Sequence, residues 1–203
     1  MPDWITGVVL AGGLSSRLGR DKAQVELAGK TLLQRALEPL QAVCLQVLVV
    51  TSAEGLASQV VAATGVRLIP DLEPGRGPLG GLYSGLHAAE GTQVLLVGCD
   101  MPFLKPALLE VVIKAAVGRQ AAVPRLDGVP QTLHAVYSPG CLPAIEKLMT
   151  AGSPGLRDLL SMVDVRYLES EEITPLDPQL LSFFNANTRT ELEQARRLLE
   201  DTG

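Results

Sequence analysis

The sequence contains few cysteines, and Cys44, Cys99 and Cys141 lie far apart without a CxxC spacing. An odd number of distant cysteines argues against a disulfide framework or a zinc knuckle, so we expect buried thiols. No apolar run approaches the about 18 residues that span a bilayer. The first residues, MPDWITG, have neither the basic start nor the apolar region of a signal peptide. These absences predict a cytoplasmic protein with no membrane partner.

The chain also lacks an excess of positive charge. Its formal net charge of -5 argues against a nucleic-acid partner bound through bulk positive charge. The charges are nevertheless uneven, because residues 164–201 hold nine acids against four bases, whereas bases prevail in residues 12–35. The bases in that N-terminal segment are Arg17, Arg20, Lys22, Lys30 and Arg35. We therefore expect an anionic ligand near the N-terminal third of the chain.

Short apolar runs recur along the 203 residues, of which 47% are hydrophobic. They are nearly continuous rather than alternating, as strands covered on both faces require. The runs are residues 5–13, 45–52, 66–71, 92–100 and 121–138. No internal repeat, low-complexity tract or interdomain linker is apparent, which predicts a single domain over residues 1–203.

Helix-like segments lie between these runs, at residues 31–43, 54–65, 78–91 and 106–118. Strands and helices that alternate at this spacing predict right-handed crossovers and a mostly parallel sheet. The expected fold class is therefore α/β, a Rossmann-like three-layer αβα sandwich. After residue 138 the alternation is less regular. Two short helices are expected at residues 139–152 and 155–163 and a possible strand at 165–170. A loop rich in proline and acidic residues then precedes a last helix at 188–200.

A glycine-rich segment, LAGGLSSRLGRDK at residues 10–22, follows the first predicted strand. It matches neither GxGxxG nor the Walker A pattern. Glycines such as Gly12 and Gly13 let backbone N–H groups approach an anion, and Arg17 and Lys22 add positive charge. A loop of this kind binds a polyphosphate or is a surface turn with solvated bases, and the segment alone favours neither interpretation.

An acidic residue, Asp100 in VGCDMPF, follows a second apolar run. An isolated aspartate in this place is usually an N-cap or a turn residue. A divalent cation that bridges phosphates, however, requires one or two carboxylates at the edge that holds the phosphate loop. Asp100 is suitably placed for that role, because ligands of parallel α/β sheets bind beyond the carboxyl ends of the strands.

Further glycines occur in GRGPLGGL at residues 75–82, at the start of a predicted helix. Gly81 is best explained by close helix packing. Two interpretations are open for Gly80. It either allows close helix packing as well, or it lets a nucleotide lie against the backbone, since the helix N-terminus faces the ligand edge.

Two amides occur near the C-terminus in FFNANTRTEL, residues 183–192. Asn185 and Asn187 are either turn formers ahead of a helix capped by Thr188, or ligand contacts from an extended segment.

Taken together, these segments resemble those of the small nucleotidyltransferases, most closely the molybdenum cofactor guanylyltransferases. LAGGLSSRLGRDK is similar to the LAGGxSxRMGxDK loop of that family, LIPD precedes GPLGGL, CDMPF occupies the CDxP position and NANT the NxNT position. The resemblance covers essentially the whole chain. Four motifs in the same order are far more specific than any one of them.

The resemblance implies an enzyme that uses GTP and Mg2+, transfers GMP to the terminal phosphate of molybdopterin and releases pyrophosphate. It also implies the contacts: Leu10, Ala11 and Gly12 with the nucleotide, Lys22 with its phosphates, Asp100 with the metal, Thr51 and Asp71 with guanosine, and Asn185 and Asn187 with molybdopterin. The chain departs from the family pattern at Leu18 (usually Met), Thr51 (usually Asn), and Arg189 and Thr190 (commonly Pro-Glu).

The acceptor phosphate in such a reaction is itself the nucleophile. Catalysis then consists of positioning and charge stabilisation, with Arg17 and Lys22 neutralising the phosphates. Asp71 is chemically suited to guanine, because a carboxylate accepts from both N1–H and N2–H. His87 and His134 fall in no motif, and we expect core or helix-surface roles for them.

Other interpretations remain open at this stage. They are a cytidylyltransferase, a sugar- or isoprenoid-phosphate nucleotidyltransferase on the same fold, and a non-catalytic nucleotide-binding module. A transient complex with proteins that deliver or receive the cofactor is a further expectation, because molybdopterin is large and labile.

Overall fold

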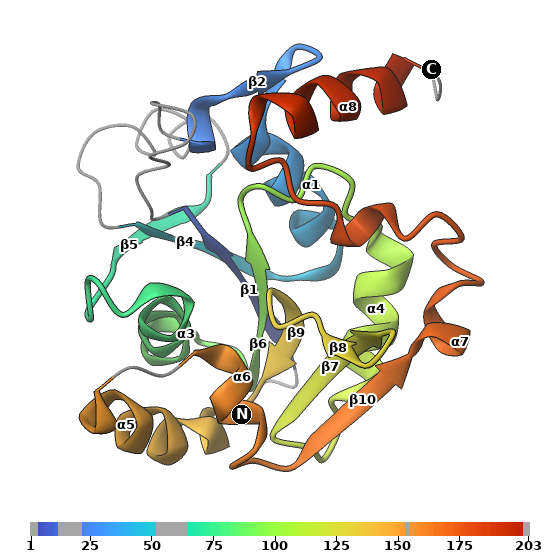
Figure 1. Ribbon diagram of the computed structural model, residues 1–203. Coiled ribbons are helices and arrows are strands. Elements are labelled where there is room, and N and C mark those ends of the chain that lie inside the picture. The colour runs from blue at the N-terminus through green and yellow to red at the C-terminus, as the bar shows by residue number, and fades with distance from the viewer. Residues whose placement is uncertain (1–3, 12–21, 52–64, 153–154, 201–203) are drawn as a thin grey trace.

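The computed structural model describes residues 4–11, 22–51, 65–152 and 155–200. Within these ranges the chain forms one eight-stranded sheet with the order β10-β7-β9-β6-β1-β4-β5, in which β8 pairs with β7 (Figure 1). The strands are β1 Ile5–Leu10, β4 Gln46–Thr51, β5 Arg67–Pro70, β6 Gln93–Gly98, β7 Ala121–Leu126, β8 Val129–Pro130, β9 His134–Tyr137 and β10 Val165–Glu169.

The sheet is mostly parallel, as predicted. In one half of the sheet, β6, β1, β4 and β5 are neighbours in this order and are all parallel. In the other half, β7 pairs in parallel with β10. The prediction for residues 121–138 was wrong, because this single apolar run forms β7, β8 and β9, and β9 pairs antiparallel with both β6 and β7. Asp127 and Gly128 reverse the chain between β7 and β8 with φ angles of 48° and 78°.

Helices cover both faces of this sheet, which confirms the three-layer arrangement (Figure 1). The α-helices in the described residues are α1 Leu32–Val43, α3 Gly77–Ala88, α4 Pro106–Ala115, α5 Leu142–Ala151, α6 Leu156–Leu160, α7 Ser170–Ile173 and α8 Arg189–Glu200. The core residues of α1, α4 and α7 pack on one face, and those of α3, α5 and α6 on the other. The predicted helix at 54–65 lies almost entirely outside the described residues.

Successive residues of each central strand supply the two cores. Val8 packs with Leu82 of α3 on one face, whereas Val9 packs with Leu37 of α1 on the other, and all four side chains are fully buried. Alternating faces are the period of a β-strand, and burial on both faces explains why the runs read as continuous apolar sequence.

The region after residue 164 is more regular than predicted. Besides β10 and the last helix it contains α7 and the 3-10 turn η3, Leu181–Phe183. A small third core joins this region to the start of the chain: Ala186 and Leu192 pack with Leu27 of the strand β2, Glu26–Leu27. No helix in the described part of the chain is long and apolar enough to cross a membrane.

Candidate active site

The carboxyl ends of β6, β1, β4 and β5 lie side by side at one edge of the sheet. Backbone hydrogen bonds continue the ladder past the strand ends. They run from the N–H of Cys99 to the Leu10 carbonyl (3.1 Å), from Ala11 to Val50 (2.9 Å) and from Asp71 to Thr51 (3.1 Å). The structure therefore places Leu10, Ala11, Thr51, Asp71 and Asp100, which the family resemblance had indicated, along one edge of the sheet.

The central part of the glycine-rich loop lies outside the described residues, and with it Gly12, Gly13 and Arg17. Lys22 begins the 3-10 turn η1, Lys22–Gln24, and only its backbone is described. Phosphate binding by these residues stays a prediction.

Gly98 and Asp100 are packed closely against one another. A Cβ atom at position 98 would lie 2.6 Å from Oδ1 of Asp100, far inside van der Waals contact. Gly98 ends β6, and Asp100 follows it in a turn with its side chain partly exposed. The glycine thus leaves the space in which the carboxylate folds back over the strand end.

The segment with the two asparagines reaches the same place. The N–H of Ala186 donates to the Asp100 carbonyl at 2.8 Å. Asn185 donates through Nδ2 to the Phe183 carbonyl at 3.0 Å, which is the turn-forming role left open above. The side chain of Glu191 accepts from the N–H of Asn187 and of Thr188, while Thr188 Oγ1 accepts from the N–H of Glu191, so the predicted cap at Thr188 is confirmed.

A buried carboxylate anchors this segment. The Asp177 side chain has no exposed area, its Oδ1 lies 2.8 Å from Lys105 Nζ, and its Oδ2 accepts from the Ser182 N–H at 2.7 Å. The Ser182 hydroxyl donates to the carbonyl of Phe103, just beyond Asp100. Burial by itself raises the pKa of Asp177, but the hydrogen bonds from Lys105 and Ser182 outweigh it and hold the pKa below its usual value.

A second carboxylate, Asp71, is held from the other side of the edge. Its Oδ1 accepts from the Glu73 N–H and lies 3.1 Å from the hydroxyl of Ser84 on α3. The same hydroxyl accepts from the N–H of Leu72 at 2.9 Å. Asp71 is partly exposed and Ser84 is buried, so the carboxylate stands between the helix and the ligand edge.

The glycines at the start of α3 are explained by packing. A Cβ atom at Gly81 would lie 2.6 Å from Leu10 Cδ2, which confirms close helix packing there. A Cβ atom at Gly80 would lie 2.6 Å from the Glu73 carbonyl oxygen. Gly80 therefore lets the helix approach the preceding loop, and a contact with nucleotide stays a prediction.

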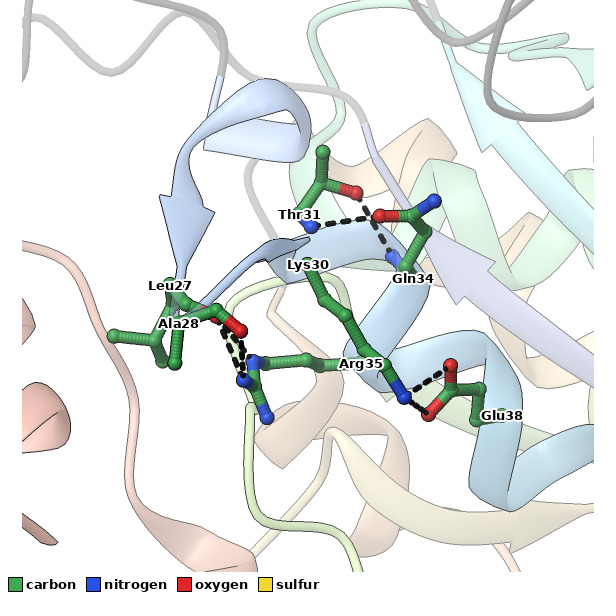
Figure 2. A network of polar contacts seen from close by, with 7 residues as sticks. All are labelled: Leu27, Ala28, Lys30, Thr31, Gln34, Arg35 and Glu38. Carbon is green, nitrogen blue, oxygen red and sulfur yellow. Dashed lines mark hydrogen bonds and ion pairs between the residues drawn. The ribbon is translucent and has the colours of Figure 1, made fainter. Parts of the chain in front are cut away.

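Two of the N-terminal bases have structural partners. The Arg35 guanidinium donates to the carbonyls of Leu27 and Ala28, the latter at φ 49° in the turn between β2 and β3, Lys30–Thr31 (Figure 2). Lys30 pairs with Glu38 on the surface of α1. These two bases therefore make contacts within the protein itself.

The histidines and cysteines have the roles that the sequence suggested. His134 is buried on β9, His87 is exposed on α3, and the three cysteines are buried and free. Both ring nitrogens of His134 lack a hydrogen-bond partner among the described residues. Burial lowers the pKa of His134 to about 4, although the backbone of Ser182 and the charge of Asp177 partly oppose this effect.

No three His, Cys, Asp or Glu side chains within the described ranges form a group that could hold a metal ion. In phosphate sites Mg2+ is commonly bound by one or two carboxylates together with oxygen atoms of the substrate. Asp100, at the end of the central strand β6, is a hard oxygen ligand of the required type.

Sequence reasoning missed four residues of this site: Gly98, Lys105, Asp177 and Ser84. Each acts through a contact with a residue from another part of the chain or with a strand end. Asp177 stands in a loop between prolines and Ser84 inside a helix, and neither position carries a local signal.

Comparison with known proteins extends this description. Residues 7–170 match the model of the MobA-like NTP transferase domain. A protein of Pelotomaculum thermopropionicum named "Probable molybdenum cofactor guanylyltransferase" is 36% identical over 197 residues, covering 97% of this chain and 94% of its own length. The molybdenum cofactor guanylyltransferase of Desulfosudis oleivorans is 33% identical, covering 98% and 97%.

A solved structure is similar as well. Molybdopterin-guanine dinucleotide biosynthesis protein A from Archaeoglobus fulgidus superposes with a TM-score of 0.84 at 29% identity, covering 97% of this chain and 99% of that one.

Proposed function

The chain belongs to the MobA-like NTP transferase family, and we propose that it transfers GMP from GTP to the terminal phosphate of molybdopterin. The products are the guanine dinucleotide form of the cofactor and pyrophosphate. The enzyme is a guanylyltransferase like its curated relatives, which match it over nearly their full length. The proposal includes residues 1–203 as a single nucleotidyltransferase domain.

One observation carries this proposal: the hydrogen bond from Ala186 to the Asp100 carbonyl. This bond joins the segment that contains Asn185 and Asn187 to Asp100, which follows β6. A transferase must hold donor and acceptor within a few ångströms, because positioning supplies much of its rate. If Asn185 and Asn187 contact the acceptor, as we propose, this bond keeps the acceptor segment next to Asp100, whereas a protein that only bound a nucleotide would need no acceptor segment there.

The nucleotide would lie along the ends of β1, β4 and β5. The residues proposed to contact it are Leu10, Ala11, Gly12, Gly13, Lys22, Thr51, Asp71, Gly80 and Asp100. Asp71 would accept hydrogen bonds from guanine N1–H and N2–H. The hydrogen bond between the Asp71 N–H and the Thr51 carbonyl supports this arrangement, because it keeps the two proposed guanosine contacts adjacent.

The proposed metal is Mg2+, held by Asp100. The space that Gly98 leaves for this carboxylate supports the assignment, since a side chain at position 98 would fill it. When bound, Mg2+ would supply positive charge to the phosphate oxygens near the reacting phosphorus.

The reaction needs no protein nucleophile. An oxygen of the acceptor phosphate forms the new bond to the α-phosphorus of GTP, and the bond between that phosphorus and the bridging oxygen of the β-phosphate breaks. Arg17 and Lys22 would stabilise the negative charge of the phosphates, and the N–H groups of the glycine-rich loop would bind the departing pyrophosphate.

Asn185 and Asn187 would contact molybdopterin on the other side of Asp100. The other elements of the proposal are a cytoplasmic location, the absence of nucleic-acid and membrane partners, and a transient complex with proteins that deliver or receive the cofactor. The expected complex follows from the size and lability of molybdopterin.

The proposal is tested by incubating the protein with Mg2+, either molybdopterin or a sugar phosphate as the acceptor, and each of the four nucleoside triphosphates while pyrophosphate release is measured. We expect release with GTP. Release with CTP alone would assign the protein to cytidylyl transfer, and release with a sugar phosphate but not with molybdopterin would change the acceptor. GTP binding without release under any of these conditions would indicate a binding module.

The role of Asp100 has a matched test. Asp100→Asn keeps the size of the side chain and removes its charge, and we expect the loss of at least about 3 kcal/mol of transition-state stabilisation, a hundredfold or more in rate. Asp127→Asn is the control, because Asp127 is an exposed carboxylate in the β7–β8 turn with a φ of 48°, a conformation that asparagine tolerates. Near-normal turnover of Asp100→Asn would refute the assignment.

A further inference from the structure

Ser84, on α3, contacts two consecutive residues that follow β5, Asp71 and Leu72. Its side chain is buried, with 1% of its area exposed. The hydroxyl oxygen lies 3.1 Å from Asp71 Oδ1 and accepts from the N–H of Leu72 at 2.9 Å. One buried hydroxyl therefore contacts both the carboxylate of Asp71 and the chain that follows it.

The hydroxyl has a single proton and two acceptors within reach. Besides Asp71 it lies 2.8 Å from the carbonyl of Gly80, one turn earlier in the helix. The bond to the earlier carbonyl is the usual alternative for a serine inside a helix. The contact with the Gly80 carbonyl is the shorter of the two, and the carboxylate of Asp71 at 3.1 Å is the second acceptor, so the hydroxyl links Asp71 to the helix.

The bonds to Asp71 are made on one side of its carboxylate. Oδ1 lies within hydrogen-bond distance of two donors, Ser84 Oγ and the Glu73 N–H, the latter at 3.1 Å. Both hydrogen bonds that the Asp71 side chain makes with described residues involve Oδ1. Two donors on one oxygen restrict rotation of the carboxylate, and with it the position of Oδ2.

A carboxylate that recognises a base must present its oxygens in the plane of two adjacent N–H groups. Recognition of this kind requires the group to be held within about 0.5 Å and 10–20° of its productive geometry by its supporting contacts. The Glu73 bond comes from the same short loop as Asp71 and moves with it. Ser84 belongs to a helix whose core residues pack against the sheet, so its bond fixes Asp71 relative to the fold.

We propose that Ser84 is a positioning residue for base selection, which holds the Asp71 carboxylate in the orientation that favours guanine over other bases. This inference depends on the proposed function, in which Asp71 binds the guanine edge. The ligand concerned is a purine nucleoside triphosphate with donors at both N1 and N2.

The test compares the binding of GTP, ITP and ATP by isothermal titration calorimetry, together with steady-state turnover with GTP. ITP lacks the 2-amino group, and ATP lacks both guanine donors. For Ser84→Ala we expect the Kd and KM for GTP to rise about tenfold, the fold-change that corresponds to one lost hydrogen bond to a charged group. The kcat should stay within about twofold, because the reacting phosphates are untouched.

The ratio of GTP to ATP affinity should fall in the same variant. Ser84→Thr keeps the hydroxyl and should restore most of the preference. Ser161→Ala is the matched control, since the Ser161 hydroxyl donates to the Asp158 carbonyl on the exposed end of α6, and it should bind all three nucleotides as the unaltered protein does.

The outcomes separate the two proposals. If the unaltered protein binds GTP, ITP and ATP equally, guanine recognition fails and the inference falls with it. If it prefers GTP and Asp71→Asn loses that preference while Ser84→Ala keeps it, the proposed function stands and the role of Ser84 is refuted. A rise in Kd of equal size for GTP and ATP in Ser84→Ala would also refute it.

Discussion

The N–H of Ala186 donates a 2.8 Å hydrogen bond to the carbonyl oxygen of Asp100, a residue 86 positions earlier in the chain. Ala186 is fully buried against Leu27 and Leu192. The backbone of Asp100 is therefore fixed by strand β6 on one side and by the C-terminal segment on the other. This relationship joins the C-terminal segment to the chain just beyond β6.

The first prediction concerns the space over the end of β6. Gly98→Ala would place a Cβ atom 2.6 Å from Asp100 Oδ1, and the carboxylate rather than the backbone would move. We expect kcat/KM for pyrophosphate release to fall about a hundredfold, because a shift of about 1 Å at a reacting centre has that effect. Thermal unfolding should change little.

Gly7→Ala provides the control for this variant. A Cβ atom at Gly7, in β1, would lie 2.9 Å from Leu40 Cδ2 in the core. It should lower the melting temperature and leave kcat/KM of the folded protein unchanged. Equal kcat/KM for Gly98→Ala and the unaltered protein would show that Asp100 does not depend on this space.

The second prediction concerns the buried ion pair. Asp177→Asn leaves Lys105 without its carboxylate, and we expect the free energy of unfolding at neutral pH to fall by about 2 kcal/mol, less than for a fully buried pair because Lys105 is 40% exposed. The pKa of Asp177 is lower in the folded protein than in the unfolded chain, where it is about 3.9. The ionised carboxylate therefore stabilises the fold above that pH, and this stabilisation is lost as the pH falls through the folded pKa. Urea unfolding at pH 7 and pH 3 measures both effects.

Asp164→Asn is the comparison for this pair. Asp164 bonds Arg119 on the surface with both side chains about half exposed, so its removal should lower stability by less than about 1 kcal/mol. Equal losses for the two variants would contradict the role of Asp177 as the anchor of the segment that leads to Ala186.

The third prediction concerns acid stability. The folded pKa of His134 is about 4, below its ordinary 6.5, so the unfolded chain binds a proton over this interval that the folded protein does not. Stability should therefore fall as the pH decreases from 6.5 to about 4, by about 3 kcal/mol for this group. His134→Leu should flatten this part of the profile.

His87→Gln is the natural control, because the chain contains only two histidines and His87 is exposed. Urea denaturation midpoints between pH 4 and pH 7 give the profile. A slope that persists in His134→Leu would mean that another group causes the acid loss.

The fourth prediction concerns the β2–β3 hairpin that follows Lys22. Arg35→Met removes the guanidinium from the Leu27 and Ala28 carbonyls, and we expect a loss of about 1–3 kcal/mol in unfolding free energy. Lys30→Gln, which breaks only the exposed pair with Glu38 (Figure 2), should lose less than about 1 kcal/mol. If both variants unfolded at the same urea concentration, the hairpin would not depend on Arg35.

The regular elements were largely predictable because their signals are local. The runs at 5–13, 45–52 and 92–100 contain β1, β4 and β6, since strands buried on both faces are apolar throughout. The same signal failed at 121–138, where apolar composition does not encode the direction of a short strand. Only the pairing of β9 with β6 and β7 makes that reversal visible.

The candidate site also contains residues that could be predicted from the sequence and contacts that could not. Asp100 was recognisable as a carboxylate at a strand end, the order of the motifs indicated the family, and the resemblance to that family indicated Asp71. The supporting contacts from Ser84 and Asp177 were not recognisable, because a hydroxyl in a helix or a carboxylate between prolines has no distinctive pattern.

The sequence by itself determined the class of fold and, through the order of its motifs, the family, because hydrophobic period and motif spacing are properties of neighbouring residues; the ligand edge is what the sequence predicts. Tertiary structure alone decided that Ala186 bonds Asp100 and that Ser84 supports Asp71. Contacts of this kind join residues that are distant in the chain or on different elements, and they form only when the packing of both cores brings those elements within hydrogen-bond distance.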